Sequence, residues 1–295
     1  MRILLLGSSG QLGQELLRSL PLLGEVIAPS RAELDVAEEL ALRDAIREIS
    51  PALIVNASAY TQVDQAEAEP ELAFRINAHA PEIMASESSR IDSGLIHFST
   101  DFVFDGAKRS PYTESDQPKP LNTYGRSKLE GEQAVAQSSS PHLILRTSWV
   151  YRLQGSHQCF PRKVMAWAKR LDELYVVEDQ IGTPTWARDL AQAVAMVLIR
   201  DTEGDAWKPR DTGLFHLTGT GQTSRLGWAR ATLEGIGLAK EVLPAKNQDF
   251  ETLAIRPHFS VLDCGAFHET FGFTLPEWIH SFRLALADLH QTNLS

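Results

Sequence analysis

The stretch Ile3-Leu4-Leu5-Leu6-Gly7-Ser8-Ser9-Gly10-Gln11-Leu12-Gly13 decides the fold of this chain. Its first four residues are a short, unbroken apolar run, which is typical of a strand buried on both faces of a parallel sheet. Glycines at every third position follow directly, and residues 14–20 form an amphipathic segment that ends at Pro21. A strand, a glycine turn and a helix in immediate succession are the setting of a dinucleotide-binding loop, because glycines let the backbone approach a pyrophosphate at the helix N-terminus. We therefore predict a dinucleotide cofactor at this loop.

The segment after the next predicted strand, residues 26–28, bears on which dinucleotide is bound. In folds of this type, an acidic residue near this strand end binds the ribose 2′-hydroxyl of NAD, whereas a basic residue accommodates the 2′-phosphate of NADP. The first candidate here is Arg31. It favours NADPH, with NADH as the alternative, although Arg31 as a solvated loop residue is a competing interpretation. Asp35 is placed to cap the helix predicted at 38–49, to bond the adenine amino group, or both.

Further strands alternate with helical segments through the first half of the chain. Apolar runs at 53–55, 95–98 and 142–146 have strand character, and helical patterns separate them. This alternation predicts an α/β fold with a doubly wound, Rossmann-type parallel sheet. Small residues at 56–61 follow one strand end and leave room for a flat ligand across the sheet edge. Asn77 lies inside a predicted helix, where its propensity is poor, and we expect it to be a buried structural amide.

The pattern of helical and strand-like segments in the second half of the chain differs from that in the first. It predicts a smaller α/β lobe that covers the substrate. We place the dinucleotide-binding domain at residues 1–150 and the substrate-binding lobe mainly at 151–295. Segments at about 176–200 are expected to return to the Rossmann-type domain. No low-complexity linker separates the halves, so we expect the two lobes to share an interface.

Composition and charge exclude several classes of function. The 295 residues carry a formal net charge of −10 that no basic run offsets, which argues against nucleic acid and anionic membranes as partners. Cys159 and Cys264 lie far apart without a ligand-spaced neighbour, so neither a disulfide framework nor a zinc site is expected. No apolar run has the length of a signal peptide's hydrophobic region or of a membrane span. We expect a cytoplasmic protein, and the sequence leaves a homodimer open.

Tyr124 and Lys128 are the candidate catalytic pair. They stand four residues apart at the start of a predicted helix, so their side chains share one face. A nearby ammonium favours the phenolate form of a tyrosine, which makes the hydroxyl a usable acid or base. Thr100, at a strand end, can add a second hydrogen bond to a carbonyl oxygen that is being reduced. Tyr-x-x-x-Lys is also a common surface pairing on helices, and the pair alone leaves that interpretation open.

These motifs together resemble the extended short-chain dehydrogenase/reductase superfamily and, within it, the dTDP-4-dehydrorhamnose reductase family. The runs Ser-Thr-Asp-x-Val-Phe at 99–104 and Arg-Thr-Ser-Trp-Val-Tyr at 146–151 are the most specific. The resemblance implies reduction of the C4 keto group of dTDP-4-dehydro-L-rhamnose to dTDP-L-rhamnose by NADPH or NADH. The other runs that carry it are at residues 7–13, 56–61, 63–67, 69–73, 120–125 and 179–185.

The resemblance also implies roles for the residues of the reaction and of the cofactor site. Tyr124 would give the proton to the sugar, Lys128 would hold the nicotinamide ribose and polarise Tyr124, and Thr100 would fix the reacting oxygen. The residues implied at the cofactor are Gly7, Ser9, Gly10, Gln11, Leu12, Arg31, Asp35, Val36, Ala57, Ala59, Tyr60, Thr61, Phe98, Tyr124 and Lys128.

A smaller set is implied at the substrate, a dTDP-linked deoxysugar. Thr100 would contact it at the reacting carbon, and Asp101 and Trp149 would line the pocket of the sugar. Arg256 belongs to an Arg-Pro-x-x-Ser-x-Leu-Asp run. It is a candidate for the nucleotide end of the substrate, with an intramolecular ion pair as the alternative.

Two departures from the family pattern bear on the site. Some members carry a glutamate cluster that can bind a divalent metal such as Mg²⁺, and Glu15 matches one of its positions. Arg188 stands where another member of that cluster is expected, and because it brings a positive charge we predict no metal. Residues 152–160, with His157 and Cys159, also depart from the pattern, which leaves the substrate-side loop open.

Two alternative functions follow. The first is a 4-ketoreductase that acts on another nucleotide-linked deoxysugar, because few residues of the sequence specify the sugar. The second is a non-catalytic regulatory subunit that keeps the cofactor loop. The presence of Thr100, Tyr124 and Lys128 together argues against the second.

Overall fold

The structure, a computed structural model, describes residues 1–155 and 157–292 of the chain. Its centre is a six-stranded sheet in the order β2-β1-β3-β4-β5-β12, in which every neighbouring pair is parallel. The chain passes from β1 outward to β2, returns to β3 on the other side of β1, and then adds β4 and β5. This order confirms the doubly wound, Rossmann-type sheet. The strands are β1 (Arg2–Leu6), β2 (Glu25–Ile27), β3 (Leu53–Asn56), β4 (Gly94–Thr100), β5 (His142–Thr147) and β12 (Gly213–His216).

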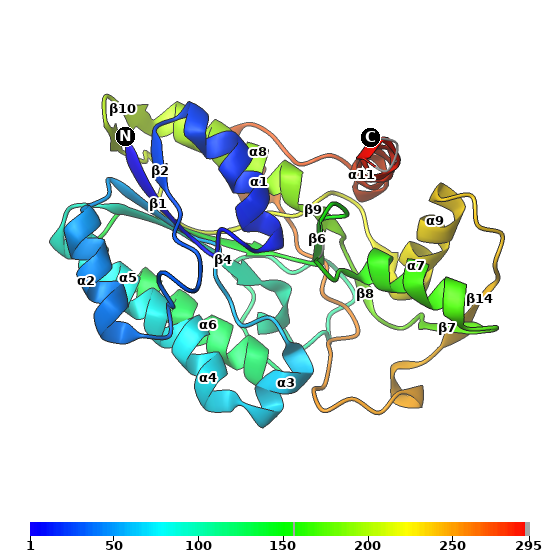
Figure 1. Ribbon diagram of the computed structural model, residues 1–295. Coiled ribbons are helices and arrows are strands. Elements are labelled where there is room, and N and C mark those ends of the chain that lie inside the picture. Colours follow the sequence, from blue (N-terminus) through cyan, green and yellow to red (C-terminus); the bar gives the residue numbers. More distant parts are fainter. Residues whose placement is uncertain (156, 293–295) are drawn as a thin grey trace.

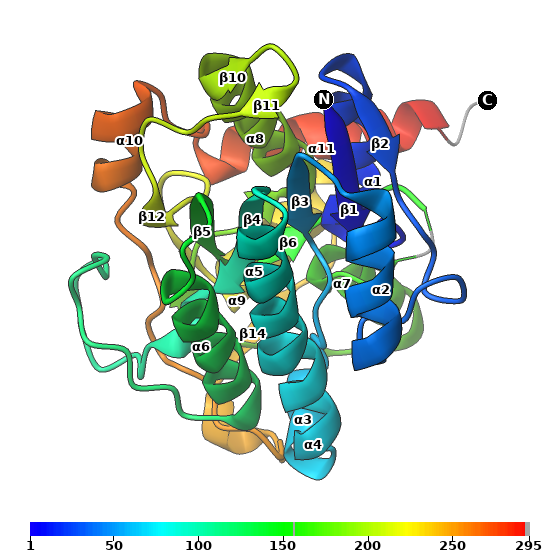
Figure 2. The ribbon, with the colours of Figure 1, turned by 90° about the vertical axis from the view of Figure 1, so that its left-hand side faces the viewer.

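Helices cover both faces of the sheet (Figures 1 and 2), which explains the unbroken apolar run of β1. Ile3 and Leu5 pack in one core and Leu4 and Leu6 in another, on the opposite face. Successive side chains of a strand point to opposite faces, so a strand between two helical layers needs apolar residues at every position. The helices are α1 (Gln11–Ser19) and α8 (Ala187–Asp201) on the first face, and α2 (Glu39–Ile49), α5 (Ala80–Arg90) and α6 (Thr123–Ala136) on the second.

The predicted helix around Asn77 changes its winding midway. It runs through α4 (Pro70–Phe74), a π-helical turn at Arg75–His79 and then α5 without a break. Asn77 lies in the π-helical turn, where its Oδ1 accepts the Tyr60 N–H at 2.8 Å. Its Nδ2 donates to the Tyr60 carbonyl and to the Ser127 hydroxyl, both at 3.0 Å. These bonds join the segment after β3, this helix and α6, so the prediction of a buried structural amide is confirmed.

A second lobe lies beside the sheet (Figure 1). Its parallel pair β7 (Leu174–Val177) and β14 (Val242–Ala245) packs against α7 (Phe160–Arg170) and α9 (Arg225–Gly235). Aromatic side chains fill the space between these elements and α11 (Trp278–Thr292). The remaining helices and strands are α3 (Val63–Ala68), α10 (Gly265–Phe271), β6 (Val150–Tyr151), β8 (Ile181–Gly182), β9 (Thr185–Trp186), β10 (Thr202–Glu203), β11 (Ala206–Trp207) and β13 (Thr223–Ser224).

The chain returns to the sheet after the first part of the second lobe. α8 packs in the same core as α1, and β12 then pairs with β5, with Gly213 opposite Leu143. The sequence predicts a strand at 213–217 but does not indicate which sheet it joins, because that depends on a pairing partner about seventy residues away. The division into domains at residue 150 stays a prediction.

A buried ion pair fastens α6 to the sheet. Glu132 and Arg146 have side chains that are each 3% exposed, and their closest atoms, Oε2 and Nη2, are 2.6 Å apart. Arg146 Nε also donates to Glu132 Oε1 at 2.9 Å, and the Ser99 hydroxyl donates to the same oxygen. The pair therefore connects α6 with both β4 and β5, next to the strand end that carries Thr100.

Replacing Arg146 with Met should lower the free energy of unfolding by about 3–5 kcal/mol, because it leaves the Glu132 carboxylate buried without its partner. Urea unfolding of the purified protein measures the loss. The matched control is Lys208→Met, which removes an exposed pair 3.8 Å from Glu203 and should cost less than about 1 kcal/mol. Equal losses for the two variants would contradict the structural role of the buried pair.

Candidate active site

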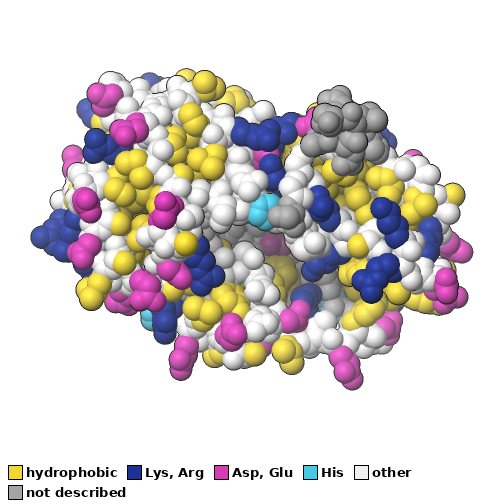
Figure 3. Space-filling view, viewed as in Figure 1, with side chains coloured by type: hydrophobic (Ala, Val, Ile, Leu, Met, Phe, Trp, Pro, Cys, Tyr) yellow, Lys and Arg dark blue, Asp and Glu magenta, His cyan; other side chains and the backbone are white. Residues whose placement is uncertain are grey.

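A cavity of about 650 Å³ opens at the carboxyl ends of the sheet strands and reaches into the second lobe. The chain leaves β1 and β3 in opposite directions, and the loops that follow these two strands separate at this point. A crevice forms where the strand order reverses in this way, and doubly wound folds bind their ligands there. Figure 3 shows the surface hollowed between the two lobes, with basic side chains beside the hollow.

The glycine loop lines one end of this cavity. Gly7 has φ +81°, and a Cβ there would lie 2.5 Å from the Ala57 carbonyl carbon. A Cβ at Gly13 would lie 2.1 Å from the Gly7 oxygen, so both positions require glycine for close backbone packing. The Gly10 N–H donates to the Gly7 carbonyl at 3.0 Å, and α1 begins at Gln11. The N–H groups of its first turn have no intrahelical partner, which fits a pyrophosphate.

Of the residues expected at the cofactor, Tyr60 does not line the cavity. Its hydroxyl donates to Glu69 at 2.7 Å, and its ring packs with Ala37 and Ile76 under the cavity wall. Side chains alternate in direction along an extended segment, so the Tyr60 side chain points away from the cavity while those of its neighbours point into it. The cavity lining does not support its assignment to the cofactor site, which stays a prediction. The residues that do line the cavity are Gly7, Ser9, Gly10, Gln11, Leu12, Arg31, Asp35, Val36, Ala57, Ala59, Thr61, Phe98, Tyr124 and Lys128.

Arg31 and Asp35 lie together at the same end of the cavity. Arg31 Nε is 3.0 Å from Asp35 Oδ2, and the Arg31 side chain is 70% exposed. Asp35 Oδ1 accepts the Ala37 N–H at 3.0 Å. The N-cap of α2 is Glu38, so the prediction that Asp35 caps this helix is wrong: its carboxylate closes a short turn before the helix begins. Arg31 is at the position expected for a 2′-phosphate contact, with its charge shared by Asp35.

Thr100, Tyr124 and Lys128 meet on one wall of the cavity. Thr100 ends β4, and α6 places the other two side chains in its first turns after Asn122 caps it by accepting the Gly125 N–H at 2.8 Å. Burial raises the pKa of the Tyr124 hydroxyl to about 12, although its hydrogen bond with Thr100 lowers the pKa. Tyr124 therefore carries its proton throughout the neutral range.

The backbone of β4 fixes Lys128, which lies one helical turn after Tyr124 on α6. Its Nζ donates to the Phe98 carbonyl at 2.6 Å, and burial lowers its pKa to about 8. Within the described residues, Lys128 makes no hydrogen bond to the Tyr124 hydroxyl. Direct polarisation of Tyr124 by Lys128 is thus not a feature of this geometry, because the ammonium is turned toward the carbonyl.

His97 lies beside Lys128 and was not identified from the sequence. Asn56 Oδ1 accepts the Ser58 N–H at 3.1 Å, which turns Asn56 Nδ2 toward His97 Nδ1 at 3.0 Å. The Asn56 amide thus bonds Nδ1, and the other ring nitrogen, Nε2, lies 3.4 Å from Lys128 Nζ. Burial holds the pKa of His97 well below its usual value. The neutral imidazole of His97 thus packs against the amine of Lys128.

The substrate-side residues lie toward the second lobe. Asp101 is 2% exposed; its Oδ1 accepts from the Thr100 hydroxyl at 3.1 Å, and Oδ2 has no hydrogen-bond partner among the described residues. Burial raises the pKa of Asp101 to about 6. Trp149 also lines the cavity. Arg256 forms an ion pair with Asp64, so the alternative ion pair is confirmed, and its role at the substrate stays a prediction. Lining residues that the sequence did not identify include Phe160, Arg225 and Trp228.

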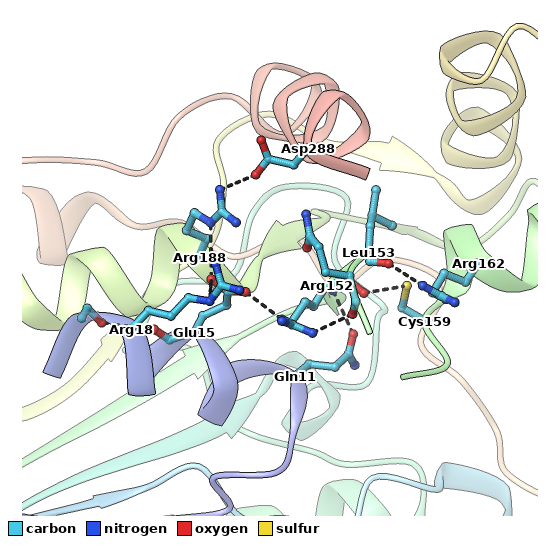
Figure 4. A network of polar contacts seen from close by, with 11 residues as sticks. Gln11, Glu15, Arg18, Arg152, Leu153, Cys159, Arg162, Arg188 and Asp288 are labelled. Atoms are coloured by element: carbon cyan, nitrogen blue, oxygen red, sulfur yellow. Dashed lines mark hydrogen bonds and ion pairs between the residues drawn. The ribbon is translucent and has the colours of Figure 1, made fainter. Parts of the chain in front are cut away.

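A network of arginines surrounds Glu15 (Figure 4). Glu15 is 2% exposed, and its carboxylate accepts from Arg152 Nε at 2.7 Å and from Arg188 Nε at 3.3 Å. Arg188 also bonds Asp288 on α11. The Arg152 N–H donates to the Gln11 side chain at 2.9 Å, so the network joins the glycine loop to the substrate-side segment 152–160. Among the described residues, no group of three or more His, Cys, Asp or Glu is arranged to hold a metal ion.

Arg188→Glu tests whether this arginine takes the place of a cation. The substitution would bring a third carboxylate to Glu15 and Asp288, a set that suits Mg²⁺. We expect millimolar Mg²⁺ to raise the melting temperature of this variant by several degrees and that of the parent by less than about one degree. The same change at Arg230, on the exposed side of α9, should give no Mg²⁺ response. A parent protein that Mg²⁺ stabilises as much as the variant would contradict this account.

Asp101→Asn should stabilise the protein at neutral pH. The pKa of Asp101 is about 6 in the folded chain and about 4 when unfolded, so the folded state binds the proton more tightly. The free energy of unfolding therefore falls as pH rises from 4 to 6, by an amount on the order of 3 kcal/mol. In urea unfolding, the free energy of unfolding of Asp101→Asn should exceed that of the parent at pH 7.5 and equal it near pH 4. Asp172→Asn, at an exposed turn, is the control; a pH-independent difference between Asp101→Asn and the parent would contradict the burial argument.

Comparisons with known proteins agree with this architecture along the whole chain. The family model described as RmlD substrate binding domain matches residues 1–291. The dTDP-4-dehydrorhamnose reductase of Burkholderia thailandensis is 39% identical, covering 98% of this chain and 99% of the relative. A solved dTDP-4-dehydrorhamnose reductase from Clostridium acetobutylicum superposes with a TM-score of 0.91 at 34% identity, covering 98% of this chain and 100% of that one. The dTDP-4-dehydrorhamnose reductase from Bacillus anthracis, solved in complex with NADP, superposes with a TM-score of 0.88 at 31% identity and covers 99% of both chains. The resemblance found in the sequence is confirmed, and the chain belongs to the RmlD substrate binding domain family together with these dTDP-4-dehydrorhamnose reductases.

Proposed function

We propose that this protein is an NADPH-dependent reductase that converts the C4 keto group of dTDP-4-dehydro-L-rhamnose to dTDP-L-rhamnose. The observation that carries the proposal is that Thr100, Tyr124 and Lys128 line the same cavity as the glycine loop. A proton donor and a dinucleotide loop in one cavity are what a carbonyl reduction requires. The relatives' activity supplies the identity of the sugar.

The residues at the β1 end of the cavity fit a dinucleotide. Gly7 and Gly13 leave no room for a side chain, and the first turn of α1 offers unpaired N–H groups to a pyrophosphate. Arg31, beside Asp35, is the proposed contact for the 2′-phosphate, which favours NADPH over NADH. When bound, the reduced nicotinamide supplies the hydride.

Tyr124 is the proposed proton donor. It must be protonated before the carbonyl is reduced, and a pKa of about 12 meets this condition. Thr100 accepts the Phe102 N–H at 3.2 Å and donates to Asp101 Oδ1 at 3.1 Å, which fixes its hydroxyl beside that of Tyr124. The Tyr124 hydroxyl can donate to a carbonyl oxygen, and Thr100 can add a second hydrogen bond by turning its single hydroxyl hydrogen from Asp101 Oδ1 to that oxygen.

Lys128 is proposed to hold the nicotinamide ribose. Its amine is anchored by the Phe98 carbonyl and has further N–H groups for the ribose hydroxyls. After Tyr124 gives up its proton, a positive charge on Lys128 lowers the energy of the phenolate, since the two side chains lie one helical turn apart. Polarisation by Lys128 then acts through space and not through a direct hydrogen bond.

The proposed role bears on where the protein acts. Among the described residues, no helix is both long and apolar enough to cross a membrane. We propose that the protein acts in the cytoplasm on a dTDP-linked deoxysugar. A homodimer stays a prediction.

Tyr124→Phe is the central test. It removes the hydroxyl but keeps the ring, so turnover should fall by roughly 10² or more, while the NADPH dissociation constant changes less than about threefold. Consumption of NADPH with dTDP-4-dehydro-L-rhamnose, followed by absorbance, measures turnover, and NADPH fluorescence titration measures binding. Tyr175→Phe is the matched control, at an exposed residue of β7. Turnover within a few-fold of the parent would remove Tyr124 as the donor, and reduction of another nucleotide-linked 4-keto sugar in preference to this one would correct the substrate.

A further inference from the structure

Arg225 brings a positive charge to the cavity, and its guanidinium has no bonding partner among the residues that the structure describes. It is the first residue of α9, and its N–H donates to the Gln180 carbonyl at 3.1 Å. Ser224 caps the helix by accepting the Gly227 N–H at 3.0 Å, so the backbone at this point is fixed. The side chain lines the cavity, and among the described residues its guanidinium makes neither a hydrogen bond nor an ion pair.

Aromatic rings hold the guanidinium in place. Its central carbon lies 3.6 Å from the centroid of the Trp149 ring, 5.0 Å from that of Phe160 and 5.7 Å from that of Trp228. A guanidinium stacked on a ring presents its N–H groups at the edge of its own plane, past the ring. Stacking therefore fixes the direction of these donors without using any of them.

The supporting ring is itself fixed. Trp149 has φ +44°, a left-handed conformation that is uncommon for a bulky residue. Its indole lies against Gly182, where an added Cβ would be 2.5 Å from the ring atom Cε2. The indole thus lies between the Gly182 backbone and the Arg225 guanidinium, and it cannot move away without losing one of the two contacts.

A cation with unused donors in this position suits an anionic ligand. Burial lowers the pKa of Arg225 to about 9, although Asp101 raises it, so the group stays charged at neutral pH. Guanidinium N–H groups removed from water without acceptors are destabilising. Arg256, which the sequence indicated for the nucleotide end of the substrate, is paired with Asp64, although its charge still lowers the pKa of Arg225. The donors of Arg225 remain available.

We propose that Arg225 binds the diphosphate of the nucleotide sugar, in the place that the sequence indicated for Arg256. This inference rests on the proposed function, which supplies a sugar diphosphate as substrate. The keto carbon must lie at Tyr124 and Thr100, and C1, which carries the diphosphate, is across the sugar ring from C4. Arg225 lies on the second-lobe side of the cavity, and a planar guanidinium matches two phosphate oxygens at once.

Binding of dTDP, dTMP and thymidine to the NADPH-saturated protein, measured by titration calorimetry, tests the inference. Arg225→Met should weaken dTDP binding about 10- to 100-fold, the loss expected for charge-assisted hydrogen bonds, and thymidine binding less than about threefold. The dTDP affinity of Arg225→Lys should lie between those of Arg225→Met and the parent, because lysine keeps the positive charge but lacks the planar pair of N–H donors. Arg230→Met, on the same helix with its guanidinium bonded to the Val242 carbonyl, is the control and should bind all three ligands as the parent does.

The outcomes separate this inference from the proposed function. If the parent itself binds no dTDP, the substrate class is wrong and the inference fails with it. If the parent binds dTDP and Arg225→Met and Arg225→Lys bind it equally well, only the role of Arg225 is wrong. Equal losses of thymidine and dTDP would also overturn that role, because Arg225 would then shape the pocket without contacting phosphate. NADPH affinity and melting temperature report whether each variant is folded. If Arg225→Met does not fold, Arg225→Lys decides the question.

Discussion

The seating of α6 on β4 is the constraint on which the rest of the site depends. Tyr124 and Lys128 belong to this one helix, so a displacement of α6 would move both away from Thr100. Below them, the Glu132–Arg146 ion pair joins α6 to the sheet. Nearer the cavity, Lys128 itself bonds the Phe98 carbonyl of β4 at 2.6 Å. The amine that we propose for the nicotinamide ribose therefore also sets the position of the tyrosine, which couples the stability of this region to its proposed chemistry.

The fold and the reacting residues could be predicted because their signals are local. An apolar run followed by glycines at 7–13 needs only a strand, a turn and a helix in sequence, and the helical spacing of Tyr124 and Lys128 places them on one face. The structure shows both features as expected. Local reasoning also produced an error at Asp35, which was expected to cap α2, whereas the N-cap is Glu38. The direction of a single side chain in an irregular segment does not follow from a local pattern.

The contacts that the sequence did not predict join distant parts of the chain. Arg256 meets Asp64, which is 192 residues away, and no spacing rule relates the two. Arg225 lines the cavity only because α9 brings it over Trp149, the last residue before β6. His97 is part of a recognisable strand, yet its contacts with Asn56 of β3 and with Lys128 of α6 depend on tertiary packing. Electrostatics at the site is thus decided by tertiary packing, which single-sequence patterns do not contain.

The net charge of −10 gives these local contacts their importance. Both a dinucleotide and a sugar nucleotide are anions, so the average field of this protein repels them. At physiological ionic strength, exposed charges more than about 8 Å away are largely screened, and the cations that line the cavity decide binding. Arg31 shares its charge with Asp35, and Lys128 has a pKa of about 8 in its buried position. Arg225 has no ion-pair partner among the described residues, and the electrostatic attraction of Asp101 keeps it charged without occupying its N–H groups. Of these three cations it is therefore the one whose interaction energy is most available to an incoming phosphate.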